Sequence, residues 1–115
     1  MKVTLYRKAH FNAAHRLYVK EWSNKKNYEI FGKCSNPNFH GHNYELIVGI
    51  TGEINPLTGM VIDLKYLKEI IKNEVEDILD HKNLNLDIDH FKKVVPSVEN
   101  ICIKVVFIYL NVFTA

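Results

Sequence analysis

The sequence predicts a single α+β domain that spans residues 1–115, and three observations support this class. Two early segments alternate apolar and polar side chains with a period of two, which is typical of half-buried strands. A later segment repeats apolar residues at helical spacing. The chain has 115 residues, of which 47% are hydrophobic, so it can form one ordinary core but not two.

The first predicted strand runs from Lys2 to His15. Its odd positions carry most of the apolar side chains, including Val3, Leu5 and Phe11, and its even positions are mainly polar. Successive side chains of a strand point to opposite faces, so His15 is expected on the apolar face of the sheet.

The segment from Arg16 to Phe39 is polar and rich in turn residues, and its pattern is too irregular to predict a helix or strand. At about 24 residues it is long for a loop without secondary structure, and such loops are often functional.

A second predicted strand follows this segment and ends at Gly52. Tyr44 and Leu46 lie on its apolar face, with Val48 and Ile50 further along. His40 and His42 share the parity of these residues, so they are also expected on the apolar face.

A helix is predicted from Asp63, which can cap it, to about Leu79; its apolar positions are Leu64, Leu67, Ile71, Val75 and Ile78. A second helix can begin at Ser97, with Ile101, Val105, Ile108 and Val112 at helical spacing, but Val105–Tyr109 suits a strand equally well. Two strands rarely form a stable sheet alone, so another element is expected to complete this one.

Charge and hydropathy exclude several function classes. The net charge of +2 comes from 15 basic and 13 acidic side chains along the whole chain, which argues against a nucleic-acid or membrane-surface binder. The longest apolar stretch, residues 101–113, is too short to span a bilayer. No export signal begins the chain, so a cytoplasmic location is expected, with Cys34 and Cys102 as thiols. Cys102 lies among apolar residues and is expected in the core.

Three histidines, His15, His40 and His42, are expected on the same apolar face. Buried imidazoles need partners for both ring nitrogens, and a shared metal ion would supply one. Three neutral imidazoles are the ligand set of a catalytic zinc whose fourth position is open. A pair such as His40-Gly41-His42 is weak evidence alone, but with His15 in register a metal site becomes the favoured interpretation.

Three other candidates have a structural interpretation beside any functional one. Cys34 could be a buried thiol or a zinc ligand, but its polar neighbours favour an accessible base or nucleophile. The pair Asp80-His81 follows a helix end, where a histidine commonly interacts with the helix dipole. Glu99 fits best as an acidic residue in the first turn of a helix.

Five motifs in order carry a resemblance to a known family: Phe11–Leu17, Phe31–Tyr44, Gly52–Val61, Asp80–Leu84 and Val98–Asn100. Together they closely resemble the 6-pyruvoyltetrahydropterin synthase family, which includes the 6-carboxytetrahydropterin synthases of queuosine biosynthesis. The resemblance covers nearly all of residues 3–100.

The resemblance implies a tunnelling fold, in which an antiparallel sheet packs against two helices and the subunits form a homotrimer or homohexamer. It implies zinc as the cofactor, with His15, His40 and His42 as ligands. Cys34 matches the catalytic cysteine, and Asp80 with His81 matches the pair that completes proton transfer. Glu99 matches a substrate-binding residue at the pterin pocket. The family fold also has two strands after the second helix, and this sequence is expected to lack them and to be poorly stable.

The activity implied is a zinc-dependent carbon–oxygen lyase that converts 7,8-dihydroneopterin triphosphate to 6-pyruvoyltetrahydropterin with elimination of triphosphate. The five residues between Cys34 and His40 favour this biopterin branch. Two alternatives remain: a 6-carboxytetrahydropterin synthase, and a non-catalytic zinc-binding member of the family.

Overall fold

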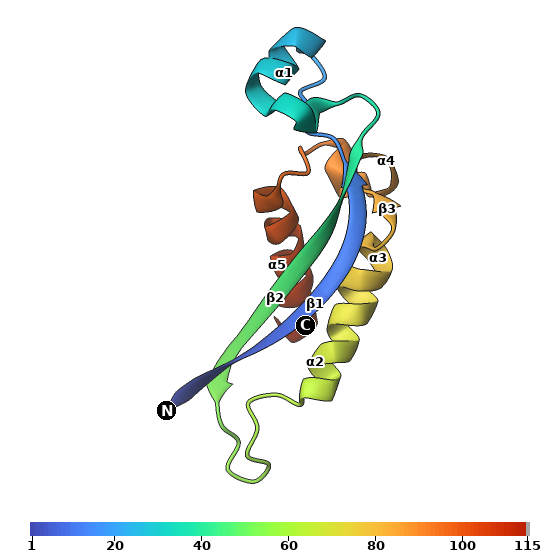
Figure 1. Cartoon of the computed structure of the whole chain (residues 1–115). Helices are drawn as coiled ribbons and strands as arrows, with labels where there is room; N and C mark the ends of the chain where they lie inside the picture. The colour runs from blue at the N-terminus through green and yellow to red at the C-terminus, as the bar shows by residue number, and fades with distance from the viewer. Residues whose placement is uncertain (115) are drawn as a thin grey trace.

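A computed structural model describes the backbone of residues 1–114 and the side-chain surroundings of residues 1–106. Two long strands, β1 (Lys2–His15) and β2 (His40–Glu53), form a twisted antiparallel pair. The helices α2, α3 and α5 pack along this pair, and α1 lies beyond the end where β1 finishes and β2 begins (Figure 1). The molecule is elongated, with extents of 60 × 25 × 23 Å.

The strand register is continuous, from Lys2 opposite Glu53 to His15 opposite His40. A third strand of two residues, β3 (Lys82–Asn83), pairs in parallel with the end of β1, so the sheet order is β2-β1-β3. The two predicted strands are confirmed. The prediction missed β3 because two residues are too few to show any periodicity.

The first predicted helix is confirmed from its cap to its end. It comprises α2 (Leu64–Ile71), a π-helical turn η2 (Lys72–Glu76) and α3 (Asp77–Leu79). The Asp63 carboxylate accepts a hydrogen bond of 2.9 Å from the backbone N–H of Lys65, which satisfies one of the free donors of the first turn. The side chains that this helix buries are Leu67, Ile70, Ile71, Val75 and Leu79.

These helical side chains and the apolar face of the sheet form two contiguous core clusters. The larger one lies toward the end of the sheet that carries the histidines, and its buried members are Phe11, Ala13, Val75, Leu79, Leu84, Phe91, Ile101 and Val105. The smaller one comprises Ala9, Val48, Leu67 and Ile71. Each fully buried aliphatic or aromatic side chain contributes about 1.5–3 kcal/mol, so this face fixes which side chains of β1 and β2 point inward.

The second helix, α5 (Val98–Thr114), forms where the sequence allowed either a helix or a strand. Ile101 and Val105 pack into the larger core cluster, one helical turn apart. Cys102 is exposed, so its predicted place in the core is wrong: a residue next to Ile101 on a helix points about 100° away from it. Within residues 1–114 no strand follows α5, and the side chains of residues 107–115 lie outside the described part.

The segment predicted as an irregular loop instead contains α1 (Asn24–Phe31) and a 3₁₀ turn, η1 (Gly32–Ser35). The Ser23 hydroxyl caps α1, and Gly32 ends it with a φ of 61°. Two shorter helical pieces, α4 (Leu84–Asp87) and η3 (Asp89–Lys92), follow β3. Among residues 1–114, no helix combines the length and the apolar character that crossing a bilayer requires.

Candidate functional site

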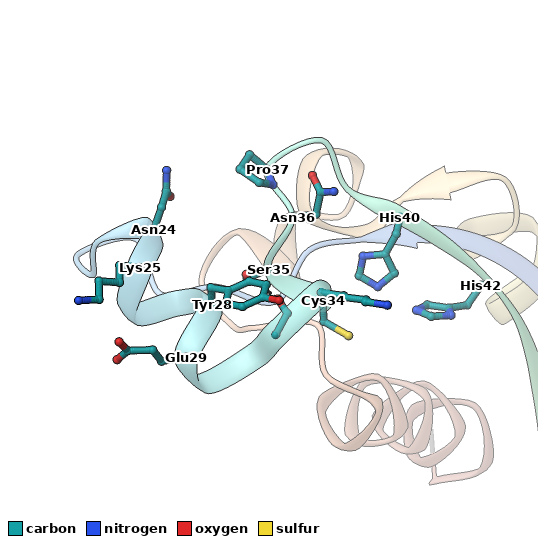
Figure 2. A pocket seen from close by; sticks show the side chains of 12 residues that line it. Asn24, Lys25, Tyr28, Glu29, Cys34, Ser35, Asn36, Pro37, His40 and His42 are labelled. Atoms are coloured by element: carbon teal, nitrogen blue, oxygen red, sulfur yellow. Dashed lines mark hydrogen bonds between the residues drawn. The ribbon is translucent and has the colours of Figure 1, made fainter.

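A cleft of about 1020 Å³ lies where α1 and η1 meet the start of β2 (Figure 2). Its wall includes Cys34 from η1 and both His40 and His42 from β2. Two lysines, Lys25 and Lys33, also line it and add positive charge. Three of the residues singled out from the sequence therefore share one cavity.

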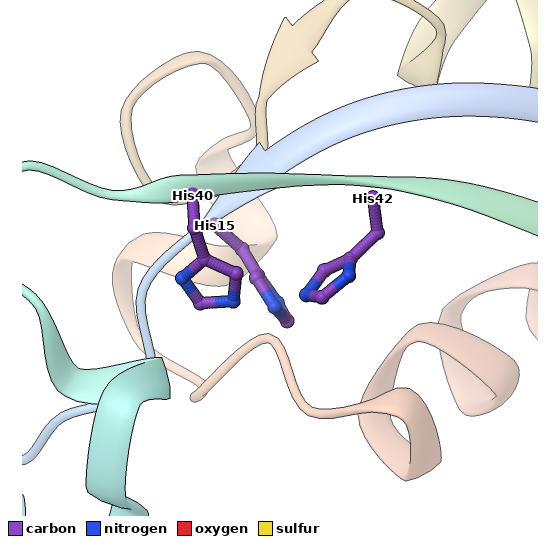
Figure 3. Close-up of side chains that lie close together, drawn as sticks. All are labelled: His15, His40 and His42. Atoms are coloured by element: carbon purple, nitrogen blue, oxygen red, sulfur yellow. The ribbon is translucent and has the colours of Figure 1, made fainter.

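The three histidines come together at the end of the strand pair (Figure 3). The register places His40 opposite His15, and His42 two residues further along the same face. One ring nitrogen from each histidine lies within 4.8 Å of the others. The structure therefore shows the convergence that the parity of the two strands predicts.

The hydrogen bonds of these rings leave nitrogen atoms free to bind a cation. His15 Nδ1 lies 2.8 Å from the carbonyl oxygen of Pro96, which can only accept, so Nδ1 donates and Nε2 keeps its lone pair. His15 Nε2 and both ring nitrogens of His40 are buried without a partner among the described residues. Buried polar atoms are nearly always satisfied, so these nitrogens fit a bound metal ion.

The electrostatic surroundings favour the neutral imidazole that binds metals. Burial lowers the pKa of His15; the hydrogen bond to Pro96 opposes this, and the nearby His40 and His42 lower the pKa further. Burial, together with His42, also lowers the pKa of His40. Both rings are therefore uncharged at neutral pH, with a lone pair available.

Cys34 is partly exposed in η1 and lies beside this cluster rather than in it. In the described part of the chain, the group of mutually close ligand atoms contains the three histidines and does not include the Cys34 thiol. The Tyr44 hydroxyl is close enough for the charge of Cys34 to add to the effect of burial, and together they raise the pKa of Tyr44 to about 12. Tyr44 is therefore a neutral phenol beside the cleft.

The chain reaches β2 from η1 through a tight turn with a strained residue. The backbone N–H of Phe39 donates to the carbonyl of Asn36 at 3.0 Å, and the Asn36 side chain accepts from the N–H of Asn38. Phe39 has a φ of 68°, which is unusual for a bulky residue. This strain lies immediately before His40, where it helps to set the direction in which β2 begins.

Glycine at position 39 should give a more stable protein than alanine at the same position. A non-glycine residue held at positive φ costs about 1–3 kcal/mol, and glycine adopts this conformation without that penalty. Both variants lose the partly buried ring, so we expect the free energy of unfolding of Phe39→Gly to exceed that of Phe39→Ala by about 1 kcal/mol in urea denaturation. Phe39→Ala is the control, because it removes the ring and keeps the strain. An alanine variant as stable as the glycine variant would contradict this account.

Asp80 and His81 form a pair at the other edge of β1. His81 Nδ1 donates to the Asp80 carboxylate at 2.8 Å, and the backbone N–H of Asn12 donates to the second carboxylate oxygen at 2.7 Å. His81 has a φ of 59°, a strained conformation that its N–H bond to Asn12 helps to hold. Neither residue lines the cleft. The structure therefore pairs these residues but, within one chain, does not bring them to Cys34.

The sequence model of the family described as 6-pyruvoyl tetrahydropterin synthase matches residues 4–111. The chain belongs to this family. It is 47% identical over 97 residues to the human 6-pyruvoyl tetrahydrobiopterin synthase, covering 84% of this chain and 67% of the human protein. A relative from Pyrococcus furiosus, a dihydroneopterin monophosphate aldolase, is 33% identical over 103 residues, or 90% of this chain and 71% of the relative.

The fold agrees with that of the 6-pyruvoyl tetrahydropterin synthase from Caenorhabditis elegans. The two structures superpose with a TM-score of 0.91 at 42% sequence identity, over 96% of this chain and 79% of the other. This similarity establishes the tunnelling fold predicted for the chain.

One contact of this 6-pyruvoyl tetrahydropterin synthase family member had no signal in the sequence. The carbonyl of Pro96 orients His15 and lies just before α5, whose first turn carries the exposed Glu99. Asn100 holds the segment that leads into α5 in place, because its side chain donates to the carbonyl of Val95 at 2.8 Å. Glu99 thus begins a helix that is tied to the histidine cluster, and its predicted role in binding substrate stays a prediction.

The Asp80 pair gives a pH prediction. The Asn12 N–H, and then His81, lower the pKa of Asp80 below its ordinary value of 3.8. A carboxyl with a lowered folded-state pKa stabilises the fold above the unfolded value, and this contribution is lost as the pH falls through the folded value. Asp80→Asn should therefore lower the urea midpoint of the metal-free protein at neutral pH, and the difference from wild type should shrink below pH 3.8.

The matched control for this experiment is Asp89→Asn, because among the described residues the Asp89 carboxylate pairs only with the exposed Lys92. Surface pairs of this kind contribute little, so the Asp89 variant should follow wild type at every pH. A deficit of Asp80→Asn that stays constant from neutral to acid pH would show that charge at Asp80 is not what stabilises this edge.

Proposed function

We propose that the chain acts as a zinc-dependent carbon–oxygen lyase that converts 7,8-dihydroneopterin triphosphate into 6-pyruvoyltetrahydropterin and triphosphate. The observation that carries this proposal is the cluster of unpartnered histidine nitrogens beside Cys34 in one cleft. The names of its relatives support the same reaction class, since the human relative is a 6-pyruvoyl tetrahydrobiopterin synthase.

His15, His40 and His42 would hold the zinc ion, and three histidines leave a coordination position for substrate. When bound, zinc would act as a Lewis acid toward the side-chain oxygens of the substrate, which makes the neighbouring C–H bonds more acidic. The Pro96 carbonyl fixes the tautomer of His15 so that Nε2 is the nitrogen that binds.

Cys34 would act as the general base in this reaction. Its thiol lies in the same cleft as His40 and His42, so a substrate held at the histidines presents its side chain to the sulfur. As a thiolate, Cys34 takes a proton from the substrate side chain, and triphosphate leaves with its bonding electrons. Internal proton shifts then turn both hydroxyl-bearing carbons of the side chain into ketones and reduce the C=N bond of the dihydropterin ring to the tetrahydro level, so no external oxidant or reductant is needed.

His81 would carry a proton, and Asp80 would orient it. The carboxylate of Asp80 holds the Nδ1–H of His81, which leaves Nε2 as the atom that exchanges a proton with the substrate. Because the pair is outside the cleft of its own chain, His81 would serve the cleft of a second copy. The proposal therefore includes a homotrimer or homohexamer, with Glu99 as a hydrogen-bond acceptor for the pterin ring.

Incubation of the zinc-loaded protein with intact dihydroneopterin triphosphate, followed by mass analysis, tests the proposal. Triphosphate with 6-pyruvoyltetrahydropterin is the expected outcome. Acetaldehyde with the carboxy product would assign the queuosine branch instead. Carbon–carbon cleavage that gives neither acetaldehyde nor the carboxy product would instead place the chain with its Pyrococcus relative, an aldolase. Unchanged substrate would make it a non-catalytic zinc-binding member.

A further inference from the structure

Arg16 follows the candidate ligand His15 and is anchored by its backbone to α4. Its N–H donates to the side-chain oxygen of Asn85 at 2.8 Å, and its carbonyl accepts from the Asn85 side-chain nitrogen at 2.9 Å. This two-way contact holds the end of β1 against α4. The Arg16 backbone is therefore a fixed point from which its side chain extends.

The guanidinium group of Arg16 links this fixed point to η1. Nε donates to the carbonyl of Ser35 at 2.8 Å, and Ser35 is buried. A terminal nitrogen lies 3.4 Å from the side-chain oxygen of Asn24, at the start of α1. The Tyr18 ring packs against the guanidinium, with Cζ 3.9 Å from the ring centre. Ring and hydrogen bonds together fix the plane of this group.

The hydrogen bond from Arg16 to Ser35 also affects Cys34, the residue before Ser35. Its carbonyl accepts a hydrogen bond of 2.8 Å from the N–H of Leu17. Two consecutive residues after His15 thus donate to two consecutive carbonyls, those of Cys34 and Ser35. The peptide that carries the thiol is held against the strand end that carries His15, although Arg16 itself does not line the cleft.

We infer that Arg16 is a positioning residue, which sets the Cys34 thiol in register with the histidine cluster. The inference rests on the proposed function, in which Cys34 is the base. Lysine could keep the positive charge, but it has neither the Nε–H that meets Ser35 nor a plane that stacks on Tyr18. Displacement of a catalytic group by about 1 Å can reduce a rate by about a hundredfold, so this contact should act on turnover.

The test compares Arg16→Met, Arg16→Lys and a matched control, Arg7→Met, in the zinc-loaded full chain. Arg7 lies on β1, and its side chain has no hydrogen bond or ion pair among the contacts of the described residues. We expect Arg16→Met to lower kcat by about tenfold to a hundredfold, with KM and zinc content unchanged. Arg16→Lys should be impaired as well, whereas Arg7→Met should match wild type.

A second readout does not depend on turnover. Cys34 is partly buried and Cys102 is exposed, so the rate at which iodoacetamide modifies each thiol can be followed by mass spectrometry in one sample. Release of η1 in Arg16→Met should accelerate modification of Cys34 severalfold, and the rate at Cys102 should not change. If the wild type has no lyase activity, this change at Cys34 alone would still support the positioning role, while the proposed function would fail.

Two results would overturn the inference. One is an Arg16→Met variant with wild-type kcat and an unaltered rate of Cys34 modification. The other is full recovery of kcat in Arg16→Lys, because positive charge alone would then explain the effect. If Arg16→Met does not fold, Tyr18→Leu removes only the stacking ring and should give a smaller shift of the same sign in both readouts. Wild-type values in that variant would likewise contradict the positioning role.

Discussion

The wild-type chain should bind one zinc ion, and His42→Ala should reduce its zinc affinity by at least about a hundredfold. Removing even a residue that only orients a ligand costs about tenfold to a hundredfold in metal affinity, so removing a ligand should cost more. A catalytic zinc is held by three protein ligands, and in this variant only His15 and His40 remain. Competition with a chromophoric chelator measures the affinity, and metal analysis after dialysis gives the stoichiometry.

The matched control is His10→Ala. His10 is an exposed histidine of β1 that points to the opposite face of the sheet from His15. The His10→Ala variant removes one histidine and leaves the histidine cluster intact, so its zinc affinity should equal that of wild type. Equal zinc content in the His42 variant and wild type would exclude the histidine cluster as the metal site.

The histidine cluster was predictable because both strands are regular. Parity alone assigned His15, His40 and His42 to one face, and this assignment holds because the ladder from Lys2 to His15 pairs every residue in order. A single bulge would have turned the later side chains to the other face. Similarly, Asp63 marked the start of the first helix because a cap acts locally.

The helix α1 could not be predicted from hydrophobic periodicity, because it buries a polar residue. Asn27 is its buried side chain, and it exchanges hydrogen bonds with the N–H and carbonyl of Val19. The helix forms by satisfying the backbone of the preceding loop rather than by covering the core with an apolar stripe. Cys102 was misplaced for a related reason, since an apolar run that turns into a helix exposes part of its residues.

The rest of the site depends on contacts that a sequence pattern does not encode. Pro96 orients His15 through a backbone carbonyl, an acceptor that almost every residue carries. The link from Arg16 to Ser35 also ends on a carbonyl. Adjacency in the sequence indicated the pair Asp80-His81, but only the fold shows that it lies at the opposite edge of β1 from β2.

Cys34→Ala should keep its zinc and lose turnover by about a hundredfold to ten-thousandfold, the range expected when a general base is removed. The roles separate because one nitrogen from each of three histidines already forms a close cluster, while the thiol lies outside it in the same cleft. Without the sulfur no group in that position takes the substrate proton, and the histidines remain intact. Zinc content and the rate of triphosphate release from dihydroneopterin triphosphate measure the two roles independently.

Cys102→Ala provides the matched control, since it removes the other thiol of the chain from an exposed position on α5. It should retain both zinc and activity, which also excludes a general effect of thiol loss.

Loss of zinc from Cys34→Ala would make the thiol a ligand. The Cys34 sulfur would then have to move toward the histidine cluster when the metal binds. Unchanged turnover with unchanged zinc would instead show that another group is the general base. Tyr44 is a poor candidate for this role, because a phenol with a pKa of about 12 holds its proton at neutral pH. For that outcome we propose the exposed His81 of a second copy of the chain as the candidate base.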